Sequence, residues 1–321
     1  RGDSCVRRAA GLRGISSLKC SMGGSGAAAP SRTPEQQRIV PFWADAAVAA
    51  LSGLTAAFTA APFIMCVDKA VTQAAAGTTS LWPALGSGIK DVFLRPHLLL
   101  RNPALYLVGG VYGSTYLTAN LIDAGCERAL NPESDAVRIS SSLPPVSIHG
   151  TAKLFGTTAV NMSAGITKDA IFARWFGAGD SASRRVPRAT FGLFAVRDTL
   201  TIAAAFTVPP MVASVLTKTG YMDEARALDA AQLISPMGMQ IVCTPIHLLA
   251  LEMFNKPNAT YTQRAQSIGS LLPQSIVARM FRFCCAYGIG GLLNTALLRR
   301  GREYALIHFS EADAAAGRPQ H

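Results

Sequence analysis

The chain has 321 residues, with 30 Lys and Arg against 19 Asp and Glu, a formal net charge of +11 and a mean hydropathy of +0.27. Half of the residues are hydrophobic and only 15% are charged, whereas an ordinary soluble domain carries about 25% charged residues. This composition excludes an intrinsically disordered chain, argues against a compact soluble enzyme and predicts a membrane protein with most charges at the ends of its spans.

The first residues of the chain differ from the rest. Residues 1–38 hold seven Lys and Arg against two acidic residues and are rich in Gly, Ser and Ala. This pattern is typical of an organellar targeting segment, and no apolar run of a secretory signal follows it. We interpret residues 1–40 as a basic tail that either targets the protein or binds a partner.

Six segments without Asp, Glu, Lys or Arg come next. Their apolar residues run continuously rather than in alternation, which favours membrane-spanning helices over a barrel. Four segments reach the length of about 20 residues that a hydrocarbon core requires. The third and sixth segments are shorter. They can cross the membrane only if the Lys and Arg residues beside them face other helices or extend to the membrane interface. The six expected spans are residues 46–67, 102–122, 154–167, 199–217, 230–251 and 283–298.

The connections between these spans alternate in length and charge. The connections after odd spans have 34, 31 and 31 residues, with 14 basic and 6 acidic side chains in total. Those after the second and fourth spans hold 5 basic and 7 acidic side chains. The excess of Lys and Arg predicts that the long connections face the untranslocated compartment, although the basic tail then lies on the opposite side.

This alternation predicts three tandem hairpin repeats in an all-α membrane protein with six transmembrane helices. Each long connection has room for a short surface helix, such as residues 81–93, in which apolar residues recur every three or four positions. The expected repeats are residues 41–135, 136–225 and 226–303, followed by a tail at 304–321. Within the second span, Gly109-x-x-x-Gly113 favours close helix packing.

The stretches that end the odd spans resemble the signature of the mitochondrial carrier family, Pro-x-Asp/Glu-x-x-Lys/Arg. They are residues 66–71, 167–172 and 245–250. The acidic position is kept as Asp68 and Asp169, the proline position only as Pro245, and His247 replaces the third acid. The resemblance covers about residues 45–302. It implies a threefold pseudo-axis, the mitochondrial inner membrane and matrix-side connections; a plastid envelope is the alternative location.

In the carrier family, charge pairs at these positions close a gate on the matrix side. Here all three basic positions are apolar, so we expect that the usual gate is lost. Lys69 and Lys168 lie beside the two acids and are candidate substitutes, although a helix directs neighbouring side chains to different sides. Arg174 and Arg197 are further candidate partners.

The expected cavity offers a second argument. The even spans, which carry the substrate contacts in the carrier family, hold no charged residue. We therefore predict no anchor for a phosphate or carboxylate, and we interpret their hydroxyls and amides chiefly as contacts between helices.

Three further sets of residues are candidate sites. His247 is either a proton-coupled group or a hydrogen-bonded core histidine. Arg197 and Asp198 are a candidate ion pair at the membrane interface. The cluster of Arg184, Arg185 and Arg188 either binds anionic lipid, such as cardiolipin, or is merely solvated. The sequence contains no spacing typical of a metal site, cofactor site or nucleic-acid interface, so none of these is expected.

Two functions remain open at this stage. The first is a carrier-fold protein without transport activity, which serves as an accessory subunit of a large inner-membrane complex of the respiratory type and contacts its other subunits. The alternative is an active solute carrier that exchanges a neutral or weakly polar metabolite by alternating access, with or without proton coupling. An enzyme is disfavoured, because no nucleophile and base converge in the sequence.

Overall fold

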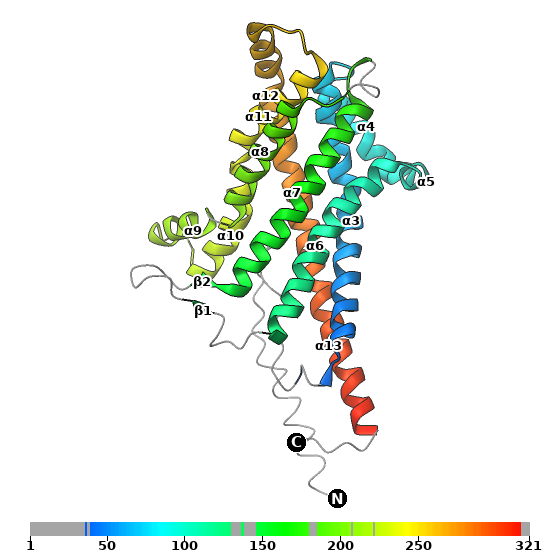
Figure 1. Ribbon diagram of the computed structural model, residues 1–321, viewed down its shortest axis with the longest axis vertical. Helices are drawn as coiled ribbons and strands as arrows, with labels where there is room; N and C mark the ends of the chain where they lie inside the picture. The colour runs from blue at the N-terminus through cyan, green and yellow to red at the C-terminus, as the bar shows by residue number, and fades with distance from the viewer. Residues whose placement is uncertain are drawn as a thin grey trace, which may run out of the picture.

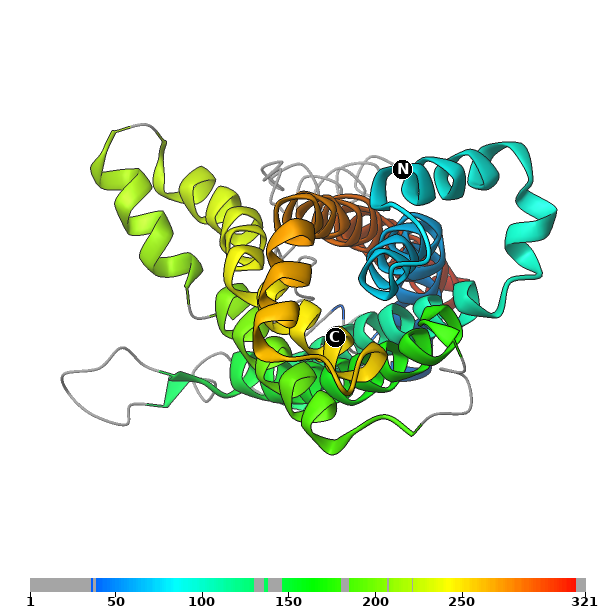
Figure 2. The same ribbon diagram turned by 90° about the horizontal axis from the view of Figure 1, so that it is seen from above.

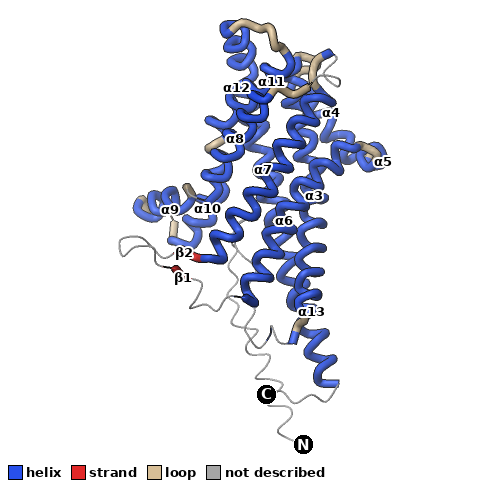
Figure 3. Tube along the Cα trace, viewed as in Figure 1, coloured by secondary structure: helices blue, strands red, loops and turns tan. Residues whose placement is uncertain are grey.

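The computed structural model describes Gln36 and residues 39–129, 136–137, 146–179, 185–206, 208–220 and 222–315. The described chain is almost entirely helical (Figure 3). Two strands of two residues each, β1 (Ala136–Val137) and β2 (Val146–Ser147), pair in antiparallel fashion before the third long helix. Nearly all of the basic tail and the last six residues lie outside the described residues.

The helices fall into long rods and short connecting pieces. In chain order they are α3 (Phe42–Ala76), α4 (Leu81–Leu94), α5 (Pro96–Leu100), α6 (Pro103–Ala129), α7 (Ile148–Phe176), α8 (Arg188–Phe206), α9 (Pro209–Lys218), α10 (Glu224–Gly238), α11 (Gln240–Asn255), α12 (Tyr261–Phe283), the π-helix η2 (Cys284–Gly291) and α13 (Leu292–Ala315).

The long helices form a closed ring. α3 packs against α6, α6 against α7, α7 against α8, and α8 against α11. α11 then packs against α12, and the continuous segment from α12 through η2 to α13 returns to α3. Figure 2 shows these helices around a common axis. In Figure 1, the connections that follow α3, α7 and α11 all lie at the upper end of the molecule, opposite the start of α3.

Three helices of the described chain are long and apolar enough to cross a membrane: Phe42–Ala76, Leu233–Asn255 and Tyr261–Ala312. They contain the first expected span and the sixth, and most of the fifth. α6 and α7 have sufficient length, with 27 and 29 residues, but their composition is more polar. The structure therefore bears out a helical chain with apolar helices fit to cross a membrane, whereas six spans in three repeats stay a prediction.

The prediction that residues 199–217 form a single spanning helix is wrong. α8 ends at Phe206, and α9 begins with Pro209 and Pro210 and points away from the ring (Figure 1). A proline has no N–H group to donate and its ring collides with the preceding helical turn, so a pair of prolines ends one helix and begins another.

The expected surface helix at residues 81–93 is confirmed as α4. Leu81 and Leu85 are buried against the ring, whereas Trp82 and Phe93 are exposed. The apolar residues of α4 therefore cover both the packed side and the outer side. An outer face of this kind suits a helix that lies in a membrane interface.

α3 and α6 approach each other closely because small residues line their contact. A Cβ atom added at Gly109 would come within 2.5 Å of the Phe58 ring, and one added at Gly113 within 3.0 Å of Leu54. A Cβ at Gly110, the next residue, would meet nothing within 4 Å. The predicted Gly109-x-x-x-Gly113 contact is thus present between α3 and α6.

We predict that Gly109→Val lowers the thermal unfolding midpoint of the detergent-purified protein, because overpacking of this kind costs about 1–3 kcal/mol. Gly110→Val is the matched control, since it places the same β-branched side chain in the same helix without a clash. Equal midpoints for the two variants would contradict the close contact between α3 and α6.

Candidate functional site

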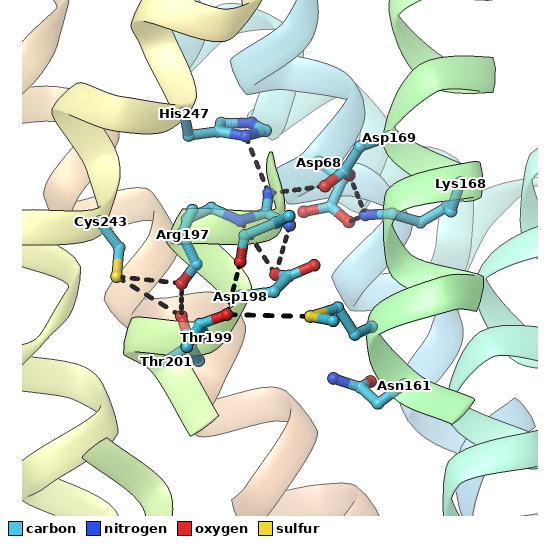
Figure 4. Close-up of polar contacts among 12 residues, drawn as sticks. Asp68, Asn161, Lys168, Asp169, Arg197, Asp198, Thr199, Thr201, Cys243 and His247 are labelled. Atoms are coloured by element: carbon cyan, nitrogen blue, oxygen red, sulfur yellow. Dashed lines mark hydrogen bonds and ion pairs between the residues drawn. The ribbon is translucent and has the colours of Figure 1, made fainter. Parts of the chain in front are cut away.

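A buried belt of charged side chains connects five segments of the ring near its upper end. α3 contributes Asp68, α7 contributes Lys168 and Asp169, and α8 contributes Arg197 and Asp198. α11 contributes His247 and Gln240, and α12 contributes Arg279 and Arg282. Figure 4 shows how the members from α3, α7, α8 and α11 point toward one another. We call these nine residues the charged belt.

Lys168 lies at the centre of the charged belt. Its ammonium contacts the Asp68 carboxylate across the ring and Oδ1 of its own neighbour Asp169 at 2.7 Å. The side chains of Lys168, Asp68 and Asp169 are 3%, 8% and 7% exposed, respectively. Buried charges are tolerated only when they are paired and hydrogen-bonded, so this triad ties α3 to α7.

Arg197 extends the charged belt from α7 to α8 and α11. Its Nη1 donates to Oδ2 of Asp169 at 2.6 Å, and its Nη2 donates to Oδ1 of Asp198 at 2.5 Å. Nη1 also lies 2.9 Å from Nδ1 of His247. The candidate ion pair of Arg197 and Asp198 is therefore present, but both side chains are buried inside the ring.

α12 closes the charged belt. Nε of Arg282 lies 2.7 Å from Oδ1 of Asp68, and its guanidinium group stacks on Tyr112. Nε of Arg279 donates to Oε1 of Gln240 on α11 at 3.1 Å. Polar contacts therefore run from α3 through α7, α8, α11 and α12 back to α3.

Both acids have basic partners although the carrier family's three basic positions are apolar, and two of the candidate partners, Lys168 and Arg197, are among them. Asp68 contacts Lys168 and Arg282, and Asp169 contacts Lys168 and Arg197. Lys168 reaches Asp68 even though it is adjacent in sequence to the other acid, because α7 directs it across the ring. Sequence reasoning placed Arg282 at the end of a short span and so missed its role.

One cation in the charged belt lacks an ion-pair partner among the described residues, and one carboxylate oxygen lacks a hydrogen-bond partner among them. The belt contains three carboxylates against four cationic side chains, and Arg279 forms no ion pair with the described residues. Oδ2 of Asp198 is buried, and the described part of the chain offers it no hydrogen-bond donor. An unmatched cation and an unmatched carboxylate oxygen are costly in such an environment unless a ligand satisfies them.

Both groups line one cavity of about 70 Å³ inside the ring. Six members of the charged belt, all but Asp68, Gln240 and His247, form one part of its wall, and Asn161, Gly165 and Thr201 form another. The expectation of an uncharged cavity is therefore wrong. It followed from the even spans alone, whereas the charges come from α7 near its end, the middle of α8, and α12.

Residues 52–302 match the family described as probable citrulline exporter. The chain belongs to this family. The match runs from within α3 to within α13 and covers every member of the charged belt. No curated protein matches the chain. The family is one of probable exporters, that is, of transporters rather than enzymes.

His247 of this exporter-family chain has the geometry of a neutral, hydrogen-bonded imidazole. A guanidinium group only donates, so Nδ1 of His247 accepts from Arg197 at this contact. The ring also packs against Phe194, with centroids 5.5 Å apart. This arrangement favours the core interpretation of His247 over the proton-coupled one.

The remaining predicted residues lie away from the cavity. Lys69 stacks over Phe176 and lines a separate cavity between α3 and α4. Pro245 lies within α11, which continues through it. Of the arginine cluster, Arg185 and Arg188 are exposed, and Arg184 falls outside the described residues.

A second ionic cluster, which sequence reasoning missed, lies near the opposite end of the ring. Arg128 contacts Asp45 at 2.5 Å, and Lys153 and His149 contact Asp123 at 2.7 and 2.8 Å. Arg302 contacts Glu127 at 3.1 Å. Asp45 and Asp68 lie 23 positions apart on α3, so about 35 Å separates the two ionic layers along the helix.

We predict that Lys168→Met lowers the stability of the detergent-purified protein by about 3 kcal/mol, because two buried carboxylates lose their shared partner. The double variant Asp68→Asn/Lys168→Met should recover part of this loss, since it removes one of the uncompensated charges. Lys69→Met serves as the control, because Lys69 forms no ion pair with the described residues. Additive losses in the double variant, measured by thermal unfolding, would contradict the pairing.

Proposed function

We propose that the chain transports a neutral α-amino acid of the citrulline type across its membrane. The observation that carries this proposal is the pair of unmatched groups in one cavity, Arg279 and Oδ2 of Asp198. An α-amino acid carries a carboxylate and an ammonium group on the same carbon atom. A ligand of this kind supplies a partner of the correct sign to both groups at once.

The chemistry of the two anchors fits an amino acid better than a simple anion or cation. The planar guanidinium group of Arg279 suits a carboxylate, which it binds through two parallel N–H groups. Oδ2 of Asp198 accepts from an ammonium, while Oδ1 keeps its contact with Arg197. A simple anion would leave Oδ2 of Asp198 unpaired, and a simple cation would leave Arg279 unpaired.

The positions of the two ionic layers support alternating access as the transport mechanism. The charged belt joins helices near the upper end of the ring, and the second cluster joins α3, α6, α7 and α13 near the other end. Each layer consists of side-chain pairs from different helices, so helix movements can break one layer while the other holds. The cavity lies beside the charged belt and is therefore closed off by it at that end.

A transport-deficient accessory subunit is the weaker candidate. That hypothesis rested chiefly on the loss of the carrier family's usual gate and on an uncharged cavity. Asp68 and Asp169 both have cationic partners, and four cationic side chains line the cavity. These two observations favour a protein that transports its substrate over one that has lost transport.

We further propose the mitochondrial inner membrane as the location and a carrier-like architecture as the fold. The ring order of the helices and the three long basic connections at one end support this proposal. Exposed Arg185 and Arg188 on the second connection support contact with anionic lipid such as cardiolipin.

The test is uptake of labelled L-citrulline into proteoliposomes that contain the purified protein and internal citrulline. We predict uptake above that of empty liposomes and a loss of about tenfold or more for Arg279→Gln, since one charge-assisted contact contributes roughly 1.5–3 kcal/mol. Gly165→Ala should lower uptake as well. Its Cβ would lie 3.5 Å from Oδ2 of Asp198, an ordinary contact that leaves the fold intact but occupies the place of the ammonium group.

Arg300→Gln is the control, because Arg300 is exposed and lies outside the cavity. Wild-type uptake equal to that of empty liposomes, for citrulline and for other neutral amino acids, would contradict transport. Co-purification of the same inactive protein with a stable membrane complex would favour the accessory subunit instead.

A further inference from the structure

We infer that Asn161 selects the side chain of the transported amino acid and favours a neutral ureido or amide group over a cationic one. This inference rests on the proposed function and goes beyond it, because it assigns the discrimination between citrulline and arginine or ornithine to one residue. It starts from the position of Asn161 on α7, on the cavity wall away from the charged belt (Figure 4).

The positions of residues along α7 give an approximate distance between two points on the cavity wall. Gly165 marks the ammonium anchor, because its position lies beside Oδ2 of Asp198. Asn161 lies one helical turn away on the same face, about 6 Å along the axis. The extended side chain of citrulline separates its Cα atom from its ureido carbon by about 6 Å, given bond lengths near 1.5 Å. An amino acid bound at Asp198 therefore places its ureido group beside Asn161.

The surroundings of Asn161 are uncharged. No charged residue occurs between Leu154 and Thr167 on α7 or between Asn102 and Ile122 on α6. The uncharged residues of the cavity lining include Val111 and Thr201 besides Asn161. Oγ1 of Thr115 on α6 lies 3.3 Å from Oδ1 of Asn161 and is also uncharged. The cavity thus has a charged half at the belt and a neutral half at Asn161.

This neutral half distinguishes side chains by charge. A ureido group both donates and accepts hydrogen bonds, and so does the amide of Asn161. A guanidinium or ammonium group only donates, and in a low-dielectric cavity it requires a carboxylate partner. The two carboxylates of the described lining, Asp169 and Asp198, belong to the charged belt and already contact Arg197. The charged belt already holds one cation in excess, which further disfavours a second cation nearby.

The experiment measures the uptake of labelled citrulline and labelled arginine by the same proteoliposomes. The wild-type protein should prefer citrulline by about tenfold or more, a typical discrimination by one buried polar contact. Asn161→Asp should reduce the ratio of citrulline to arginine uptake by about tenfold or more and raise arginine uptake in absolute terms, because the new carboxylate pairs with the guanidinium group.

Asn161→Leu is the matched variant of similar size without charge or hydrogen bonds. It should lower citrulline uptake relative to norleucine, an amino acid with an unbranched apolar side chain, and should not admit arginine. This second readout keeps the inference testable if Asn161→Asp fails to fold. Increased arginine uptake by both variants would indicate that either substitution merely widens the cavity. That result would overturn the role of charge.

The inference and the proposed function fail in different ways. Wild-type protein that transports neutral amino acids, with ratios that neither substitution changes, would overturn the role of Asn161 and leave the transport function intact. Wild-type protein that transports neither citrulline nor norleucine would overturn the proposed function itself.

Discussion

The structure depends on the burial of Lys168 between two carboxylates, Asp68 of α3 and Asp169 of α7. Charged groups removed from water must find partners of opposite sign, and these partners come from helices that are far apart in sequence. Arg197 and Arg282 extend the same pairing to α8 and α12. The requirement to satisfy each buried charge therefore brings these helices together at one end of the ring, and the order of their contacts follows from it.

The sequence predicted the elements that depend on local patterns. Continuous apolar runs predicted the long helices, and the spacing of apolar residues in 81–93 predicted α4. The positions of Asp68 and Asp169 at the ends of helices followed from a resemblance to a short motif. The proline pair at 209–210 is also visible in the sequence, but residues 199–217 hold no charge, and an uncharged window alone does not reveal that a proline pair divides it into two helices.

The sequence offered Lys168 and Arg197 only as candidates beside Lys69 and Arg174, because pairing across a ring depends on helix rotation and register. Lys168 lies 100 positions from Asp68, and Arg282 lies more than 200 positions from it. A search for uncharged windows also removes from view the residues at the window edges, and Arg279 and Arg282 stand at such an edge. The cations of the cavity come from residues that flank the apolar segments, and the helices direct these side chains into the ring.

The central claim is that the unmatched Arg279 and Asp198 receive the two charges of an amino acid. An experimental structure of the membrane-embedded protein with bound L-citrulline tests this claim most directly. The account predicts ligand density in the ring cavity, with the carboxylate at Arg279, the ammonium at Oδ2 of Asp198 and the ureido group beside Asn161. A cavity closed by a protein carboxylate on Arg279, or citrulline bound elsewhere on the chain, would contradict it.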